Sequence, residues 1–243
     1  MTNPPQLPPR RYSIHLAPSS NFGLETVSKF KALRLKALKD EPQYFFSTYN
    51  REIEFTNEQW EARLRNEKAY TFAAIPFSAH QPISPFSSNG YVHLAEANEW
   101  VGTATLVEIA PIASYPRPPP VEASMIFGIG GMYVHSGHRR HGIGALLLNA
   151  CLDQAFRKAA DSFSKFLLEL QVERNNRNAV LLYAKLGFRP RANDPEALEI
   201  IRRFATGESV DGLNISGAMA MEKSGSTDGP RACMAYNKHS EDK

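Results

Sequence analysis

The chain has 243 residues, of which 42% are hydrophobic and 10% aromatic, enough to fill the core of one sizeable domain. The formal net charge of +3 is too small to indicate a nucleic-acid or membrane partner, and no dense block of like charges suggests either. Two isolated cysteines, Cys151 and Cys233, do not form a disulfide framework. No apolar run suits a secretory signal or a membrane span, so we expect a cytoplasmic protein, with the nucleus as the alternative.

The first half of the chain alternates short strands, helices and proline-rich loops. We expect a flexible segment over 1–10, one domain over 11–222 and a flexible tail over 223–243. Thr56 and Gln59 form a capping box at the start of a helix. The other elements expected here are a strand over 12–16, a helix over 25–39 that ends before Pro42, strands over 70–75 and 100–109, and proline-rich loops near 76–90 and 110–120.

The second half of the chain has a clearer pattern. A glycine-interrupted strand is expected over 125–134, and a helix with an apolar stripe begins near Gly142. A strand over 166–172, a helix over 179–186 that ends at Gly187, and a final strand over 215–221 complete the pattern. The alternation of strands and helices predicts an α/β or α+β class with a mixed sheet.

The segment between the strand at 125–134 and the following helix has the features of an anion site. The first turn of a helix leaves backbone N–H groups without intrahelical partners, and the helix dipole adds positive potential there. Gly142 and Gly144 let an anion approach these amides closely, and Arg139 and Arg140 add positive charge. An ordinary tight turn is the alternative for glycines considered alone.

Two other classes of phosphate site do not fit this segment. Gly144 is followed by Ala145 and Leu146, which excludes the Lys-Ser/Thr pair of a Walker A loop. Leu147 occupies the position where the dinucleotide fingerprint requires its third glycine. The segment instead resembles the acetyl-CoA signature of the GNAT (GCN5-related N-acetyltransferase) superfamily, Gln/Arg-x-x-Gly-x-Gly/Ala, which stands here as Arg139, Arg140, His141, Gly142, Ile143 and Gly144.

The resemblance implies where a cofactor is held. Backbone amides from Arg139 to Ala145 would bind the pyrophosphate of acetyl-CoA. The strand end at Met132, Tyr133 and Val134 would border the pantetheine arm, which pairs with the backbone of Met132 and Val134. It also implies the family fold, a central mixed and mostly antiparallel sheet that splays between its fourth and fifth strands and is flanked by helices.

A second motif at 176–188 resembles the family pattern Asn-x-x-Ala-x-x-Leu-Tyr-x-x-x-Gly-Phe. By this resemblance Asn176 would bond pantetheine and Tyr183 would protonate the departing thiolate. Taken singly, Asn176 also suits a helix N-cap, and Tyr183 also suits a core aromatic. The two motifs occur in the family's order and at its usual distance, which favours a common function.

The resemblance implies an acetyl-CoA-dependent N-acetyltransferase that acts by direct attack of a primary amine, carried by a small molecule or a peptide. The strand at 127–134 lacks a carboxylate, so the general base stays open between Glu169, Glu173 and water, with Glu122 a surface charge. A catalytically silent acyl-CoA-binding module is the alternative function. We expect no metal, because His135, His138 and His141 have no cysteine or carboxylate cluster beside them. Both a monomer and a homodimer stay open.

Overall fold

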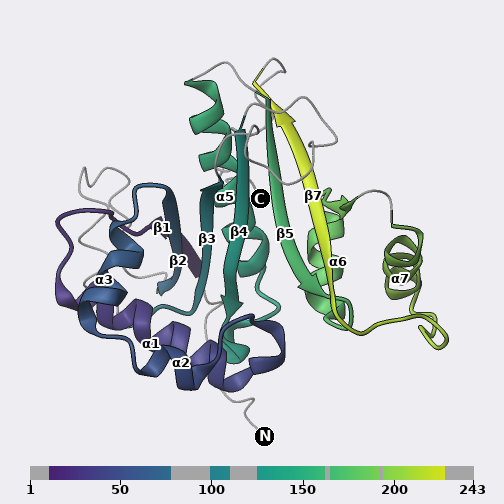
Figure 1. Cartoon of the computed structure of the whole chain (residues 1–243), viewed down its shortest axis with the longest axis horizontal. Helices are drawn as coiled ribbons and strands as arrows, with labels where there is room; N and C mark the ends of the chain where they lie inside the picture. Colours follow the sequence, from purple (N-terminus) through teal and green to yellow (C-terminus); the bar gives the residue numbers. More distant parts are fainter. Residues whose placement is uncertain (1–10, 78–98, 110–124, 162–164, 192–193, 228–243) are drawn as a thin grey trace, which may run out of the picture. The chain divides into compact units, whose positions relative to one another are not determined.

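The computed structural model describes residues 11–77, 99–109, 125–161, 165–191 and 194–227 (Figure 1). The expected loops at 76–90 and 110–120 and the segment at 1–10 lie largely or wholly outside this part, as does Cys233. In chain order the helices and strands are β1 (Arg11–Leu16), α1 (Leu24–Asp40), the 3₁₀ turn η1 (Pro42–Tyr44), α2 (Tyr49–Ile53), α3 (Asn57–Arg65), β2 (Ala69–Phe77), β3 (Gly102–Ile109), β4 (Met125–Val134), the 3₁₀ turn η3 (Ser136–His138), α5 (Ile143–Ala160), β5 (Lys165–Glu173), α6 (Arg177–Lys185), β6 (Arg189–Pro190), α7 (Pro195–Thr206) and β7 (Ala218–Ser226).

The strands form a seven-stranded sheet in the order β1-β2-β3-β4-β5-β7-β6. The pairs β1–β2, β5–β7 and β6–β7 are antiparallel, whereas β4 and β5 run parallel. The β4–β5 ladder extends from the pair Met125–Phe166 to the pair Ile129–Leu170, and residues 130–134 of β4 lie beyond it. Gly131, just past the last pair, has φ +62°, a departure from extended backbone that glycine accommodates without a Cβ clash.

The chain divides into two compact units, in which β3, β4 and α5 each contribute to both. Unit 1 consists of residues 1–105 and 131–150, and unit 2 of residues 106–130 and 151–243. The core of unit 1 lies among α1, α3 and the strands. Buried side chains, among them Val27 of α1 and Tyr133 of β4, form one cluster with the fully buried Trp60. The Phe30 ring meets Trp60 edge to face at a centroid distance of 5.8 Å, and the Phe55 ring is tilted against Trp60 at 5.6 Å.

Unit 2 is built on the long antiparallel pairing of β5 with β7. Leu168 and Leu170 of β5 are buried, as is Met221 of β7. Phe166 lies opposite Gly225 in this ladder, and a Cβ on Gly225 would stand 2.3 Å from the Phe166 ring. The glycine therefore leaves the space that the aromatic ring of the neighbouring strand fills.

Several sequence predictions need correction. The final strand is Ala218–Ser226 rather than 215–221, so it extends past residue 223, where the tail was expected to begin. The amphipathic helix α7 was not predicted, although Asp194 and Pro195 supply an N-cap and a proline in its first turn, and Ala197, Ile200 and Phe204 are its buried residues. The Thr56–Gln59 capping box is confirmed, with hydrogen bonds in both directions.

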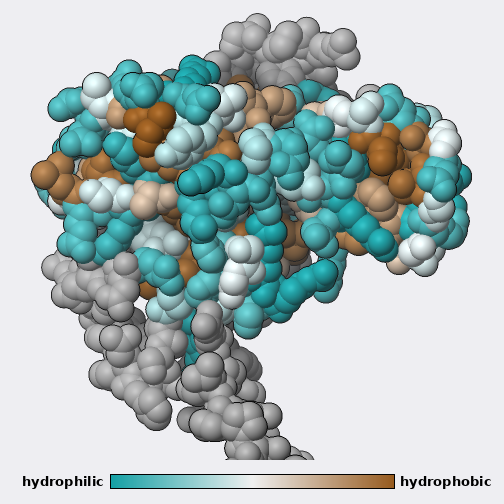
Figure 2. All heavy atoms as spheres, turned by 90° about the horizontal axis from the view of Figure 1, so that it is seen from below, coloured by the Kyte–Doolittle hydropathy of each residue, from teal (hydrophilic) through white to brown (hydrophobic). Residues whose placement is uncertain are grey.

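On the face seen from below in Figure 2, most described residues are hydrophilic, and hydrophobic side chains form separate patches. Among the described residues, the large hydrophobic side chains exposed to solvent are Leu16, Leu24, Phe46, Ile53, Ile109 and Leu198. None of the described helices has the length and apolar character needed to cross a membrane.

Candidate functional site

The turn between β4 and α5, in unit 1, exposes a series of backbone N–H groups. The 3₁₀ turn closes with a bond from Arg139 N–H to Ser136 O at 3.3 Å. The first backbone bond of α5 runs from Leu146 N–H to Gly142 O at 3.1 Å. The amides of residues 140–145 lie between these two bonds, at the positive end of an 18-residue helix. This is the geometry of an anion-binding helix N-terminus.

Two residues of this turn have left-handed backbone conformations. Arg140 has φ +66° and Gly142 has φ +77°. For a non-glycine residue such as Arg140 this conformation costs roughly 1–2 kcal/mol, and strain of this kind is concentrated at functional sites. Left-handed residues in a turn direct successive N–H groups into a concave anion-binding nest. A Cβ at Gly142 would meet nothing within 4 Å, so its glycine is required by φ rather than by space.

The two arginines of the turn have different environments. The Arg139 Nε donates to the Val134 carbonyl at 2.9 Å, and its Nη2 lies 2.6 Å from Glu41 Oε1. Arg140 is exposed, and its guanidinium has no ion-pair partner among the residues that the structure describes. The sequence predicted that both arginines add charge to the site, but the Arg139 charge is neutralised by Glu41, a residue that the motif does not include.

His141 folds back onto the turn. Its Nδ1 lies 2.7 Å from the Arg139 carbonyl and 3.3 Å from the His138 carbonyl, so the ring nitrogen donates to the backbone. The Tyr12 ring of β1 lies beside it, at a centroid distance of 5.6 Å. His141 therefore stabilises the turn from which the site is built.

The other two histidines near the turn also make structural contacts. The His135 Nδ1 accepts from Gly137 N–H at 3.1 Å. His138 is buried, and its Nδ1 lies 3.1 Å from the Tyr12 hydroxyl. Within the described part of the chain, no group of three or more His, Cys, Asp or Glu residues is arranged to hold a metal ion.

The end of β4 combines a buried side chain with half-buried neighbours. Tyr133 is only 3% exposed and belongs to the core of unit 1, while Met132 and Val134 are half-buried. Because the ring of Tyr133 is held in the core, only its backbone could pair with an extended ligand arm. Burial, together with the negative charge of Asp40, raises the pKa of Tyr133 to about 12, so its hydroxyl remains a donor.

Asn176, in unit 2, is the N-cap of α6. Its Oδ1 accepts from Ala179 N–H at 3.2 Å, as expected for an N-cap asparagine. Because the cap uses the carbonyl oxygen, the Nδ2 amide group is the part of the side chain left to donate to a ligand. The structural and the ligand-binding interpretations of Asn176 are therefore compatible.

Tyr183 lies on the buried face of α6, with 6% of its surface exposed. Its ring approaches that of Phe188, with the centroids 6.0 Å apart. Burial, and then the nearby thiol of Cys151, raise the pKa of Tyr183 above its ordinary value. The phenol is therefore protonated at neutral pH, the state that a proton donor requires.

The acidic candidates of unit 2 are found on neighbouring strands. Glu169 of β5 faces Glu222 of β7 in the ladder, and Arg191 forms an ion pair with both. Burial raises the pKa of Glu222, although the charge of Arg191 opposes the rise. Sequence reasoning singled out Glu169 but missed Glu222, because the cross-strand pairing that joins them requires the register of β7. Glu173 ends β5, and Glu122 lies outside the described residues.

An amide-lined turn at a helix N-terminus, placed after a strand of a mixed sheet, is typical of anion-binding α/β proteins. The family model "Acetyltransferase (GNAT) family" matches residues 38–188, which is more than half of the chain. The chain therefore belongs to the GNAT acetyltransferase family, whose acetyl donor is acetyl-CoA. The family and the fold class predicted from the sequence are confirmed.

Solved structures are similar to the chain in fold, although their sequences differ widely from it. A GNAT-family acetyltransferase from Streptococcus pneumoniae has a TM-score of 0.51 at 17% identity, covering 88% of this chain and 99% of its own. Arabidopsis thaliana NAA60 in complex with a bisubstrate analogue has a TM-score of 0.47 at 13% identity, covering 87% and 98%. The NatC complex bound to Gag peptide and CoA has a TM-score of 0.47 at 18% identity, covering 87% and 96%. No curated protein matches the chain by sequence.

Proposed function

We propose that the protein is an N-acetyltransferase that moves the acetyl group of acetyl-CoA to a primary amine of a small molecule or a peptide. The observation that carries the cofactor half of this proposal is the turn over residues 139–145. Its consecutive amides, its left-handed Arg140 and Gly142, and the exposed charge of Arg140 suit a pyrophosphate. Family membership supports the transfer of an acetyl group.

The proposed reaction is a direct attack. The amine nitrogen forms a bond to the thioester carbonyl carbon, and the tetrahedral species collapses as the carbon–sulfur bond breaks. The backbone amide near Met132 would stabilise the oxyanion. The protonated, buried Tyr183 would give its proton to the departing thiolate, and the attacking amine would lose a proton to a base.

The base stays open between Glu169, Glu173 and water. Arg191 forms an ion pair with Glu169, so this carboxylate is already engaged in a contact within the protein. That same pairing favours the second candidate function, a silent acyl-CoA-binding module. We further propose a cytoplasmic location, which immunolocalisation of the full chain would test.

A thiol-release assay over a panel of small amines and peptides tests the proposal. We expect acetyl-CoA-dependent thiol release with at least one amine, and binding of CoA by calorimetry. Tight binding of CoA with no turnover on any amine would favour the silent module instead. Absence of CoA binding would remove both functions.

The role of Tyr183 can be tested in the same assay. Removing a general acid costs on the order of 100-fold in rate, so we expect Tyr183→Phe to lower kcat strongly. Its Kd for CoA should stay within about twofold of the wild-type value, because the ring is retained. Tyr49→Phe, on α2, is the matched control and should leave both quantities unchanged. Unchanged turnover in Tyr183→Phe would remove its proposed role.

A further inference from the structure

The guanidinium of Arg139 joins three parts of unit 1. Its Nε binds the carbonyl of Val134, the last residue of β4, and its Nη2 binds Glu41, the C-cap of α1. The Cζ atom lies 5.9 Å from the centroid of the Tyr133 ring. These contacts direct the charged group toward the end of the strand and the end of the helix.

A second contact lies beside the first. The Tyr133 hydroxyl donates to Asp40 Oδ2 at 3.3 Å. Asp40 is the last residue of α1, and Glu41 follows it directly. Two consecutive carboxylates at the end of α1 therefore bind two side chains near the end of β4. Asp40 binds Tyr133, which lies within the strand, and Glu41 binds Arg139, which follows the strand and belongs to the phosphate-site motif.

These two carboxylates occupy an unfavourable position in α1. The C-terminus of a helix carries the negative end of the dipole, so acidic side chains there destabilise the helix unless cations or donors compensate. Compensation comes from Lys36, 3.0 Å from Asp40, and from Tyr133 and Arg139. The hydrogen bond from Lys36 is the largest cause that lowers the pKa of Asp40. The end of α1 thus depends on the turn for part of its stability, and the turn depends on the end of α1.

We propose that the Glu41–Arg139 ion pair holds the β4–α5 turn in its anion-binding conformation, so that Arg139 is a positioning residue and not a phosphate ligand. Arg140 then supplies the side-chain charge for the phosphates. This inference rests on the proposed function, because it concerns how the same turn binds acetyl-CoA. It adds Glu41, almost 100 residues before the motif, to the determinants of cofactor affinity.

The two roles for Arg139 predict opposite effects of removing Glu41. If Arg139 binds phosphate directly, Glu41 competes with the ligand, and Glu41→Ala frees positive charge and tightens binding of CoA. If Arg139 positions the turn through Glu41, Glu41→Ala weakens binding. The sign of the change therefore separates the two roles without knowledge of the acceptor amine.

The experiment measures the Kd of CoA by calorimetry for the wild type, Arg139→Ala, Glu41→Ala and the double variant. We expect each single variant to bind about tenfold more weakly and the double variant to bind no more weakly than either one, because both remove one interaction. Glu41→Gln retains an oxygen acceptor and should lose only about threefold. Glu25→Ala, which removes the Glu25–Lys29 ion pair at the other end of α1, is the matched control and should bind as the wild type does.

Arg140→Ala completes the design. It should weaken binding, add to the effect of Glu41→Ala, and reduce the salt dependence of Kd, as expected for loss of a direct phosphate contact. Thermal unfolding of every variant shows whether it is folded at the temperature of the titration, and Glu41→Gln provides the test if Glu41→Ala is not.

Each outcome has one meaning. Unchanged or tighter binding by Glu41→Ala overturns the positioning role, and so does a double variant about 100-fold weaker than the wild type, the sum of two independent effects. A wild-type protein that does not bind CoA at all overturns the proposed function instead. The failure of the inference is thus distinct from the failure of the function on which it rests.

Discussion

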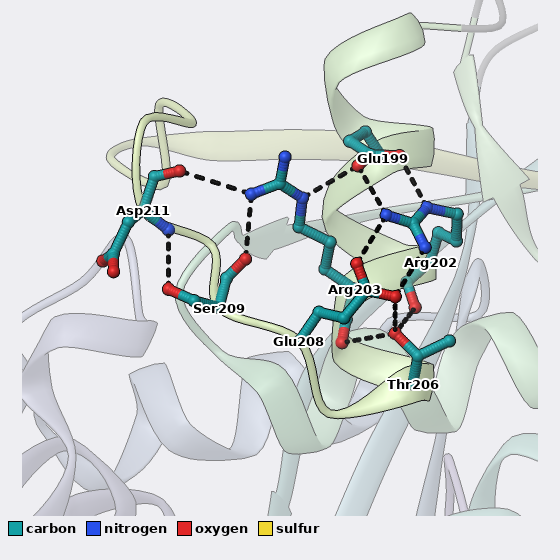
Figure 3. A network of polar contacts seen from close by, with 7 residues as sticks. All are labelled: Glu199, Arg202, Arg203, Thr206, Glu208, Ser209 and Asp211. Carbon is teal, nitrogen blue, oxygen red and sulfur yellow. Dashed lines mark hydrogen bonds and ion pairs between the residues drawn. The ribbon is translucent and has the colours of Figure 1, made fainter.

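Each unit contains a network of arginine–glutamate ion pairs, and the two networks differ chiefly in burial. In unit 1, the side chain of Glu52 on α2 has no exposed surface. It accepts two hydrogen bonds from Arg34, at 2.8 and 3.0 Å, and one from Arg63, at 2.9 Å. In unit 2, Arg202 of α7 binds Glu199 and Glu208 at 2.7–2.9 Å, and half of its side chain is exposed (Figure 3). Bond lengths alone do not distinguish the two networks.

The difference shows that burial decides what an ion pair contributes. A buried charge without partners costs several kcal/mol, so the partners of Glu52 are essential once it is inside. Exposed pairs lose most of their attraction to water and salt. The Glu52 network also joins three helices, α1, α2 and α3, whereas the exposed network ties the end of α7 to the loop that follows it.

The largest expected effect is therefore at Glu52. Glu52→Ala leaves Arg34 without its carboxylate in a largely buried position, and we expect the free energy of unfolding to fall by about 3–5 kcal/mol. Urea unfolding followed by circular dichroism measures this loss. Glu61→Ala, which removes the exposed Glu61–Arg65 pair of α3, is the matched control. A loss as small as that of the control would contradict the importance of burial.

The next effect is the response of the Glu52 network to acid. Burial opposes ionisation of Glu52, but hydrogen bonds from Arg34 and Arg63 outweigh it and lower its pKa from 4.5 to about 2. A depressed folded-state pKa stabilises the protein above pH 4.5, and this contribution is lost as the pH falls through about 2. We expect wild type to lose about 3 kcal/mol from this group across that window. In unfolding titrations over the same pH range, the free energy of unfolding of Glu52→Gln should fall by about 3 kcal/mol less than that of the wild type. An identical response of the two proteins to acid would contradict the assignment of this loss to Glu52.

The pattern of residues predicted much of the fold but little of these networks. The bounds of β4, the Thr56 cap and the Gly187 helix end followed from local signals, because glycine and capping residues act within a few positions. The contacts of Glu52 span 18 residues to Arg34 and 11 to Arg63. No periodicity within a five-residue helix reveals such partners.

In the candidate site too, local features were predictable from the sequence and contacts between distant residues were not. The amides of the turn were predictable, because a motif fixes consecutive backbone positions. The direction of the Arg139 side chain was not, since it depends on Glu41 at the end of α1. The facing of Glu169 and Glu222 likewise required the register of β7, which extends five residues beyond the strand expected from the sequence.

A smaller effect compares the two arginines that share Glu52. Arg34 is 13% exposed and makes two bonds, whereas Arg63 is 37% exposed and makes one. We expect Arg34→Ala to cost about 2–3 kcal/mol in unfolding free energy and Arg63→Ala to cost about 1 kcal/mol, part of it from lost stacking on Phe55 and Trp60. Measured in the same urea series, equal costs would show that the number and burial of the bonds do not set the ranking.

The smallest effect is expected in the exposed network of α7. The carboxylate of Glu199 binds both Arg202 and Arg203, and hydrogen bonds from these two arginines lower the pKa of Glu199 to about 2. Glu199→Gln removes this carboxylate. Water already solvates these groups, so the thermal midpoint should change little at low salt and should match the wild type at high salt. Arg203 keeps its bonds to the carbonyls of Ser209 and Asp211 in this variant, which preserves the end of the helix (Figure 3). A loss that persists at high salt would show that this network is shielded from solvent, and would remove the contrast with Glu52.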